Sequence, residues 1–159
     1  MIVGVINFIF TIVAVATIDR FGRKPLLLFG LTGMMFSMFL IGFAFHPDTP
    51  GKTWILIPIL SFVAFYSMSL GPIAWVIVSE IFPTRIRGMA MAICMVVLYV
   101  ADFMVSLTFP WMISNMGNGS FFFFTAMCLG AILFVAFLVK ETKGKSLEEI
   151  EKMWGIIKE

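Results

Sequence analysis

Apolar residues in this chain fall into five long runs separated by short polar stretches rich in proline, glycine and charge. The runs cover residues 1–18, 25–45, 54–78, 89–113 and 121–139. A helix rises about 1.5 Å per residue and the hydrocarbon core of a bilayer is about 30 Å thick, so each run is about as long as a membrane-spanning helix requires. Since no linker is long enough to separate domains, the pattern predicts one all-α bundle of five transmembrane helices over residues 1–139.

Composition supports a membrane environment. Hydrophobic residues make up 61% of the chain and charged residues 13%, and the mean hydropathy is +1.07. Soluble domains have about 45–50% apolar and about 25% charged residues. A soluble fold of this length could not bury so much apolar surface. The net charge of +2 is spread over short clusters and gives no extended basic face, so nucleic acid is not an expected partner.

Positive charges indicate how the bundle is oriented. All eleven lysines and arginines except Lys52 follow the first, third or fifth run. Cytoplasmic loops of membrane proteins retain such residues. The pattern therefore predicts a multi-pass protein with an external N-terminus and a cytoplasmic C-terminus.

Residues 140–159 form a predicted cytoplasmic tail. Ser146 and Glu149 have the spacing of a capping box, which marks the start of a helix. Apolar residues then recur at helical spacing, namely Leu147, Ile150, Trp154 and Ile157. We expect a short amphipathic helix lying under the bundle.

The third run contains Gly71 and Pro72. Proline lacks a backbone donor and clashes with the preceding turn, so the pair predicts a break or kink in this helix. Broken helices near the midplane often hold the substrate of secondary transporters. A kink that serves packing alone is the alternative. Trp75 lies three residues beyond the proline, where it either faces a ligand or packs.

Three motifs give the chain a family resemblance. They are the loop Asp19-Arg20-Phe21-Gly22-Arg23-Lys24-Pro25, the stretch from Gly71 to Gly88, and Glu141-Thr142-Lys143-Gly144 followed by Ser146-Leu147-Glu148-Glu149-Ile150. The first resembles the loop motif of the major facilitator superfamily. The other two resemble the signature and the C-terminal motif of its sugar porter family. The first run and loop are particularly similar to bacterial D-xylose/proton symporters, and the resemblance covers essentially the whole chain.

The resemblance implies that the five helices are helices eight to twelve of a twelve-helix transporter, most of its C-terminal half, in a bacterial inner membrane. It implies secondary transport of a monosaccharide (pentose or hexose) or polyol by alternating access. The partners would be the sugar, the N-terminal half and the lipid bilayer, and coupling to protons is left open. The alternative is a truncated fragment or a small membrane scaffold without transport activity.

The resemblance also suggests substrate-binding residues, namely Gly71, Trp75, Tyr99 and Asp102. Trp75 matches a pocket tryptophan, whose ring stacks on a sugar while its N–H donates a hydrogen bond. Leu98, Tyr99 and Asp102 stand where sugar porters usually have an amide, Trp and Asn. An acidic side chain in mid-span costs about 2.5–3.5 kcal/mol. Asp102 either replaces Asn as a hydrogen-bonding group or binds substrate or a proton.

On the cytoplasmic side the resemblance assigns four residues to a charge network that keeps this side closed while the transporter faces outward. They are Asp19, Arg23, Glu80 and Arg87. The alternative is that these charges only set orientation. No paired carboxylates, activated nucleophile, phosphate loop or metal cluster indicates an enzyme or a cofactor. Cys94 and Cys128 lie far apart within apolar runs, and we expect them to pack as small apolar residues.

Overall fold

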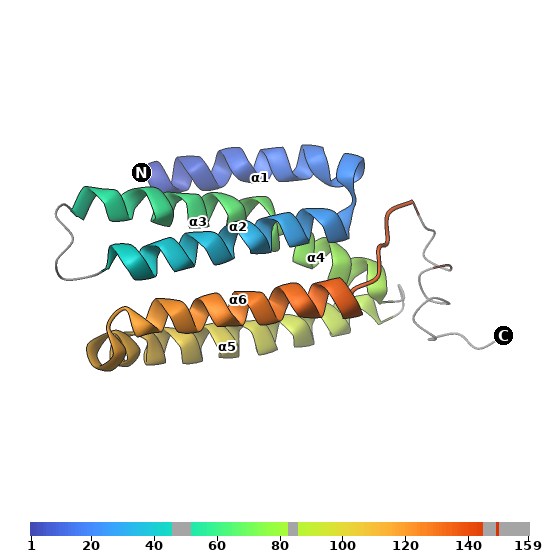
Figure 1. Cartoon of the computed structure of the whole chain (residues 1–159). Coiled ribbons are helices and arrows are strands. Elements are labelled where there is room, and N and C mark those ends of the chain that lie inside the picture. Colours follow the sequence, from blue (N-terminus) through green and yellow to red (C-terminus); the bar gives the residue numbers. More distant parts are fainter. Residues whose placement is uncertain (46–51, 83–85, 145–148, 150–159) are drawn as a thin grey trace.

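The computed structural model describes residues 1–45, 52–82, 86–144 and 149. These residues form helices and turns and contain no strand, which confirms the all-α prediction. The elements are α1 (Ile2–Phe21), α2 (Arg23–Ala44), the 3-10 helix η1 (Lys52–Ile55), α3 (Leu56–Met68), α4 (Leu70–Ile81), α5 (Arg87–Met116) and α6 (Gly119–Leu138) (Figure 1). Apart from Glu149, the predicted tail helix lies outside the described residues.

Within the described residues, four helical segments are long and apolar enough to cross a membrane, judged by length and composition. They are α2, α3 with α4 (Leu56–Ile81), α5 and α6, and α1 is apolar over Ile2–Ile18. Figure 1 shows the helices side by side along one direction. The α1–α2 turn, the end of α4 and the segment after α6 lie together at one end of the bundle, which is the end predicted to be cytoplasmic.

The third apolar run is interrupted at Ser69, whose φ of −121° and ψ of −82° are not helical. Its N–H is shared between the carbonyl oxygens of Phe65 and Tyr66, at 3.1 and 3.2 Å. Gly71 and Pro72 lie in the first turn of α4, where a missing N–H costs no intrahelical bond. The helix therefore ends before the proline and begins again around it.

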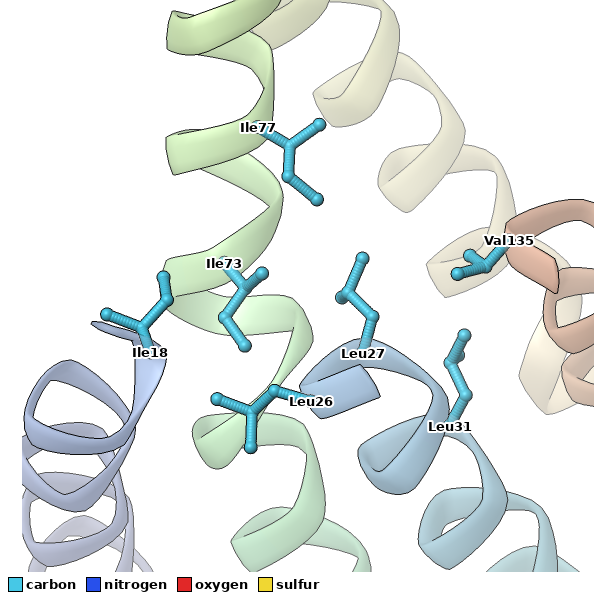
Figure 2. Close-up of a cluster of buried hydrophobic side chains, with 7 residues drawn as sticks. All are labelled: Ile18, Leu26, Leu27, Leu31, Ile73, Ile77 and Val135. Carbon is cyan, nitrogen blue, oxygen red and sulfur yellow. The ribbon is translucent and has the colours of Figure 1, made fainter. Parts of the chain in front are cut away.

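A cluster of buried apolar side chains joins α1, α2, α4 and α6. It consists of Ile18, Leu26, Leu27, Leu31, Ile73, Ile77 and Val135 (Figure 2). In lipid, close packing rather than exclusion of water holds such a cluster together. Ile73 and Ile77 are one turn apart, so they fix which face of α4 points into the bundle.

Two glycines let α2 approach the interrupted helix closely. A Cβ atom at Gly30 would lie 2.0 Å from Ser69 Oγ and 2.1 Å from Ser69 Cβ, and one at Gly33 would lie 2.4 Å from the ring of Phe65. Small residues commonly allow such backbone approach between membrane helices. The position of the break therefore depends on the absence of side chains from this face of α2.

Gly30→Ala should lower the stability of the bundle, because a methyl group cannot fit without moving Ser69. Overpacking of this kind costs about 1–3 kcal/mol. Thermal unfolding of the chain in detergent, followed by circular dichroism, measures the change. The matched control is Gly130→Ala on an exposed part of α6, where an added Cβ has no atom within 4 Å. Equal unfolding temperatures for the two variants would contradict the packing argument.

Candidate functional site

The N-terminus of α2 is capped by a residue from the opposite end of the chain. Glu141, just after α6, accepts hydrogen bonds from the backbone N–H of Arg23 (to Oε1) and of Lys24 (to Oε2), each at 3.0 Å. These N–H groups have no partner within the helix. A carboxylate at this position also interacts favourably with the helix dipole. Glu141 therefore ties the start of α2 to the segment after α6.

Gly22 makes this capping possible. Its φ is +92°, which L side chains rarely adopt. A Cβ atom here would also lie 3.0 to 3.2 Å from the carboxyl atoms of Glu141. Any other residue would strain the α1–α2 turn and push the carboxylate away.

Arg23 and Glu80 form an ion pair between the start of α2 and the end of α4. Arg23 Nη2 and Nε lie 3.0 and 3.2 Å from Glu80 Oε1. The two side chains are 17% and 20% exposed, so solvent screens the pair less than a fully exposed one. The hydroxyl of Thr142, which is buried, donates to Glu80 Oε2 at 2.6 Å. Glu80 thus binds both α2 and the segment after α6.

Two lysines bind carbonyl groups in the last turns of other helices. Lys24 Nζ lies 2.8 Å from the carbonyl oxygen of Ala136 in α6, and Lys143 Nζ lies 2.5 Å from that of Arg20 in α1. Cations favour helix C-termini because of the dipole and the unpaired carbonyl groups. We call the resulting set the charge cluster; it consists of Arg23, Lys24, Glu80, Glu141, Thr142 and Lys143. It joins α1, α2, α4 and α6.

The four residues of the predicted charge network are placed differently. Arg23 and Glu80 are bonded to each other. Arg87 begins α5, and its Nε is buried without a hydrogen-bond partner in the part of the chain that the structure describes. Asp19 lies in the last turn of α1, and its side chain is outside what the structure describes. The role of these residues in closing one state stays a prediction.

Sequence reasoning did not assign positions to Lys24, Glu141, Thr142 and Lys143 in this cluster. The signal was present in the Glu141-Thr142-Lys143-Gly144 motif, which we used only for the family resemblance. The partners of Glu141 and Lys143 across the chain lie more than a hundred residues away and that of Thr142 lies 62 residues away, so no local pattern identifies them.

The predicted substrate residues lie on α4 and α5. Trp75 is two residues from both Ile73 and Ile77, about 200° around the helix, so it points away from the apolar cluster. It is half-buried. Tyr99 and Asp102 are three residues apart on one face of α5 and are both exposed, Tyr99 to 64%. Among the described residues, no hydrogen bond or ring contact joins Trp75 to either of them.

α5 contributes an open wall to the bundle. In its most apolar stretch of 18 residues none is buried. Among the described elements, the helix contacts α6 and α4. Tyr99 and Asp102 are therefore presented outward, where a further element or a ligand can reach them.

Membrane-length apolar helices, one of them broken, with a bonded charge cluster at one end, define a polytopic membrane protein. Residues 1–154 match the family model described as "Sugar (and other) transporter". The chain belongs to this family, which confirms the resemblance drawn from its motifs.

Individual relatives agree with the family. The chain is 45% identical to the D-xylose-proton symporter of Escherichia coli (strain K12), over 97% of this chain and 33% of the symporter. It is 41% identical to the arabinose-proton symporter of Bacillus subtilis (strain 168), over 96% of this chain and 33% of that protein. It is also 41% identical to the glucose facilitated diffusion protein of Zymomonas mobilis, with the same coverage. The chain thus spans about a third of the length of these relatives.

Solved structures show the same fold. The inward open conformation of the xylose transporter XylE from E. coli matches with a TM-score of 0.87 and 47% identity, over 96% of this chain and 34% of that one. The proton:xylose symporter XylE bound to 6-bromo-6-deoxy-D-glucose, a protein of the major facilitator superfamily, matches with a TM-score of 0.87 and 44% identity over the same shares. The fold is therefore part of a major facilitator superfamily bundle, as predicted.

Proposed function

We propose that this chain forms part of a secondary transporter that moves a monosaccharide (pentose or hexose) or a polyol by alternating access. The observation that carries the proposal is the 45% identity to a D-xylose-proton symporter over 97% of the chain, together with a matching fold. In this mechanism one half of the transporter rocks against the other about a central site. The chain supplies one wall of that site.

The wall that we propose consists of the first two turns of α4 and the outward face of α5. The break at Ser69 shortens the helix before Gly71, and Trp75 then points away from the packed cluster. An indole ring can stack on the apolar face of a sugar while its N–H donates to a hydroxyl group. Tyr99 and Asp102 add a phenol and a carboxyl group that can bond further hydroxyl groups.

Relatives differ in how they drive transport, since two are named proton symporters and one a facilitated diffusion protein. For this chain we propose that Asp102 binds the substrate or a proton. Its exposure on α5 supports access from the central site. The alternative role, an Asn-like hydrogen-bonding group, predicts no pH dependence from this residue.

A chimera provides the test, with this chain replacing the matching third of the E. coli D-xylose-proton symporter. We expect uptake of at least one labelled pentose, hexose or inositol by cells that make it. Adding a protonophore distinguishes the modes, because it abolishes accumulation by a symporter but not equilibration by a facilitator. A chimera that inserts into the membrane but transports none of these compounds would contradict the proposal and favour the fragment or scaffold alternative.

We also propose that the end carrying the charge cluster faces the cytoplasm of a bacterium, with the protein in the inner membrane. The basic residues near this end support it through the positive-inside rule. A fluorescent protein fused after residue 159 should fluoresce, whereas alkaline phosphatase fused there should be inactive. An active phosphatase would indicate the opposite orientation and contradict the proposal.

Asp102→Asn in the chimera should leave folding unchanged and raise the KM for sugar about tenfold, since hydrogen bonds to charged groups contribute about 1.5–3 kcal/mol. Uptake measured from pH 5 to pH 8 adds the proton test. The control is Thr108→Val, because the Thr108 hydroxyl already donates within its own helix, to Met104. An unchanged KM and an unchanged pH profile would leave Asp102 with the Asn-like role.

A further inference from the structure

An apolar groove lies between α1 and α2, with α3 contributing to its lining. Its lining residues are Thr17, Phe21, Pro25, Leu26, Phe29 and Met68, and its volume is about 350 Å³. Thr17 is the one polar side chain in this lining, and its hydroxyl donates to the carbonyl oxygen of Val13 in its own helix. The groove therefore offers no unmet hydrogen-bonding side chain, and hydrocarbon is the chemistry that fits it.

Two basic residues, Arg20 and Lys143, lie near the end of the groove that faces the charge cluster. Arg20 follows Thr17 by three residues and directly precedes Phe21, so it continues the face of α1 that lines the groove. Arg20 is exposed, and within the described residues its guanidinium has no hydrogen-bond or ion-pair partner. The ammonium of Lys143, also exposed, lies 2.5 Å from the carbonyl oxygen of Arg20.

The neighbouring carboxylates offset these cations only in part, although Glu141 keeps its negative charge because its hydrogen bonds come from backbone N–H groups. Glu80 is bound by Arg23 and Thr142, and Glu141 caps α2. The sequence around the α1–α2 turn carries one acidic residue, Asp19, and three basic residues, Arg20, Arg23 and Lys24. The mouth of the groove is thus cationic, and the groove itself is apolar.

From this combination we propose that the groove binds one acyl chain of an anionic phospholipid, with the lipid phosphate at Arg20 and Lys143. An apolar slot with Arg20 and Lys143 at its polar end complements such a lipid, because arginine pairs well with phosphate and basic residues attract anionic headgroups. The proposal requires membrane insertion and is independent of the transported substrate. A bound lipid would touch both sides of the α1–α2 turn and Met68, the residue before the break.

A second groove in the same protein serves as an internal reference. It lies at the opposite end of α2, has a volume of about 440 Å³, and is lined by Leu40, Phe43, Ala44, Trp54, Ile57 and Pro58. Both linings are free of basic residues, but the reference groove has one basic residue near it in the sequence, Lys52, whereas the first groove has Arg20 and Lys143 at its charged end. Both grooves should accept an acyl chain, but only the first should prefer an anionic headgroup.

The experiment places the chain in phosphatidylcholine nanodiscs with a trace of lipid that carries a photoactivatable acyl chain. The labelled lipid is either phosphatidylglycerol or phosphatidylcholine, and mass spectrometry locates the crosslinks. We expect phosphatidylglycerol to label the first groove roughly fivefold more than phosphatidylcholine does, since each surface charge contributes modestly to binding anionic lipid. The reference groove should be labelled equally by both.

Arg20→Gln should reduce labelling of the first groove by phosphatidylglycerol to the level of phosphatidylcholine. Because the guanidinium bonds to no described residue, helix content measured by circular dichroism should not change. The matched control is Lys52→Gln, the basic residue on the opposite side in sequence, which should leave the preference intact. A persistent preference in Arg20→Gln, or equal labelling by both lipids in the original chain, overturns the proposal.

Two further outcomes assign the groove to another occupant. If labelling disappears in the chimera, the rest of the transporter covers the groove. If it disappears when two copies share one nanodisc, a second copy covers it. Either result contradicts a lipid site, whereas unchanged labelling in both settings supports one.

Discussion

Glu80→Gln in the chimera should slow sugar uptake at least about tenfold while leaving sugar binding nearly unchanged. The substitution weakens the bonds from Arg23 and removes the negative charge that Glu80 places beside its partly buried guanidinium. Hydrogen bonds to charged groups contribute about 1.5–3 kcal/mol, which corresponds to a shift of about 10- to 100-fold between two conformations. Losing the bond lowers the population of the conformation in which α2 and α4 are joined. Because alternating access needs both conformations, transport then slows.

The measurements for Glu80→Gln are initial uptake rates in vesicles and sugar affinity in detergent. Arg23→Gln should have the same effect, and the double variant should be no slower than either single variant, since both remove one interaction. Asp48→Asn, in the stretch between the second and third apolar runs, is the control and should transport normally. Fully additive losses in the double variant would show that the pair does not act as a unit.

Trp75→Ala should raise the KM for sugar about 30-fold or more. Removing an aromatic anchor at a binding site commonly costs at least about 2 kcal/mol, and here it removes both the stacking surface and the indole donor. Trp75→Phe keeps the ring and loses the donor, so we expect a smaller rise, of about fivefold, from one lost hydrogen bond.

A structural role for Trp75 would give a different result. In that case Trp75→Ala would lower the unfolding temperature and leave the KM unchanged, so both quantities have to be measured on the same preparation. Trp111→Ala is the matched control, because Trp111 is 62% exposed on α5 and lies outside the proposed wall. If Trp111→Ala and Trp75→Ala raise the KM equally, the sugar-stacking role is wrong.

The apolar pattern was sufficient to predict the helices, because membrane-length runs and their turns are local features. It placed the break near Gly71 and Pro72, and the structure puts it at Ser69. The shift has a physical reason: the proline is accommodated in the first turn of a new helix, so the chain must leave the helix earlier. Gly30 opposite Ser69 allows this position, and that contact between distant segments is not visible in a local pattern.

The charge cluster was predictable only in part. Arg23 and Glu80 were grouped through the family resemblance, and the structure bonds them. The capping of α2 by Glu141 depends on how α6 packs against α2, since 118 residues separate Glu141 from Arg23. Gly22 lies in the turn between α1 and α2, and its lack of a side chain also makes room for the carboxylate of Glu141.

The Glu141 cap has a consequence for synthesis. A ribosome makes α2 long before it makes Glu141, so the first N–H groups of α2 stay without this partner until nearly all of the described chain exists. The α1–α2 turn then depends on other hydrogen-bond acceptors, such as water, throughout the insertion of α3 to α6. The second helix therefore acquires its cap only after α6 has been made, and the segment after α6 completes a helix that entered the membrane well before it.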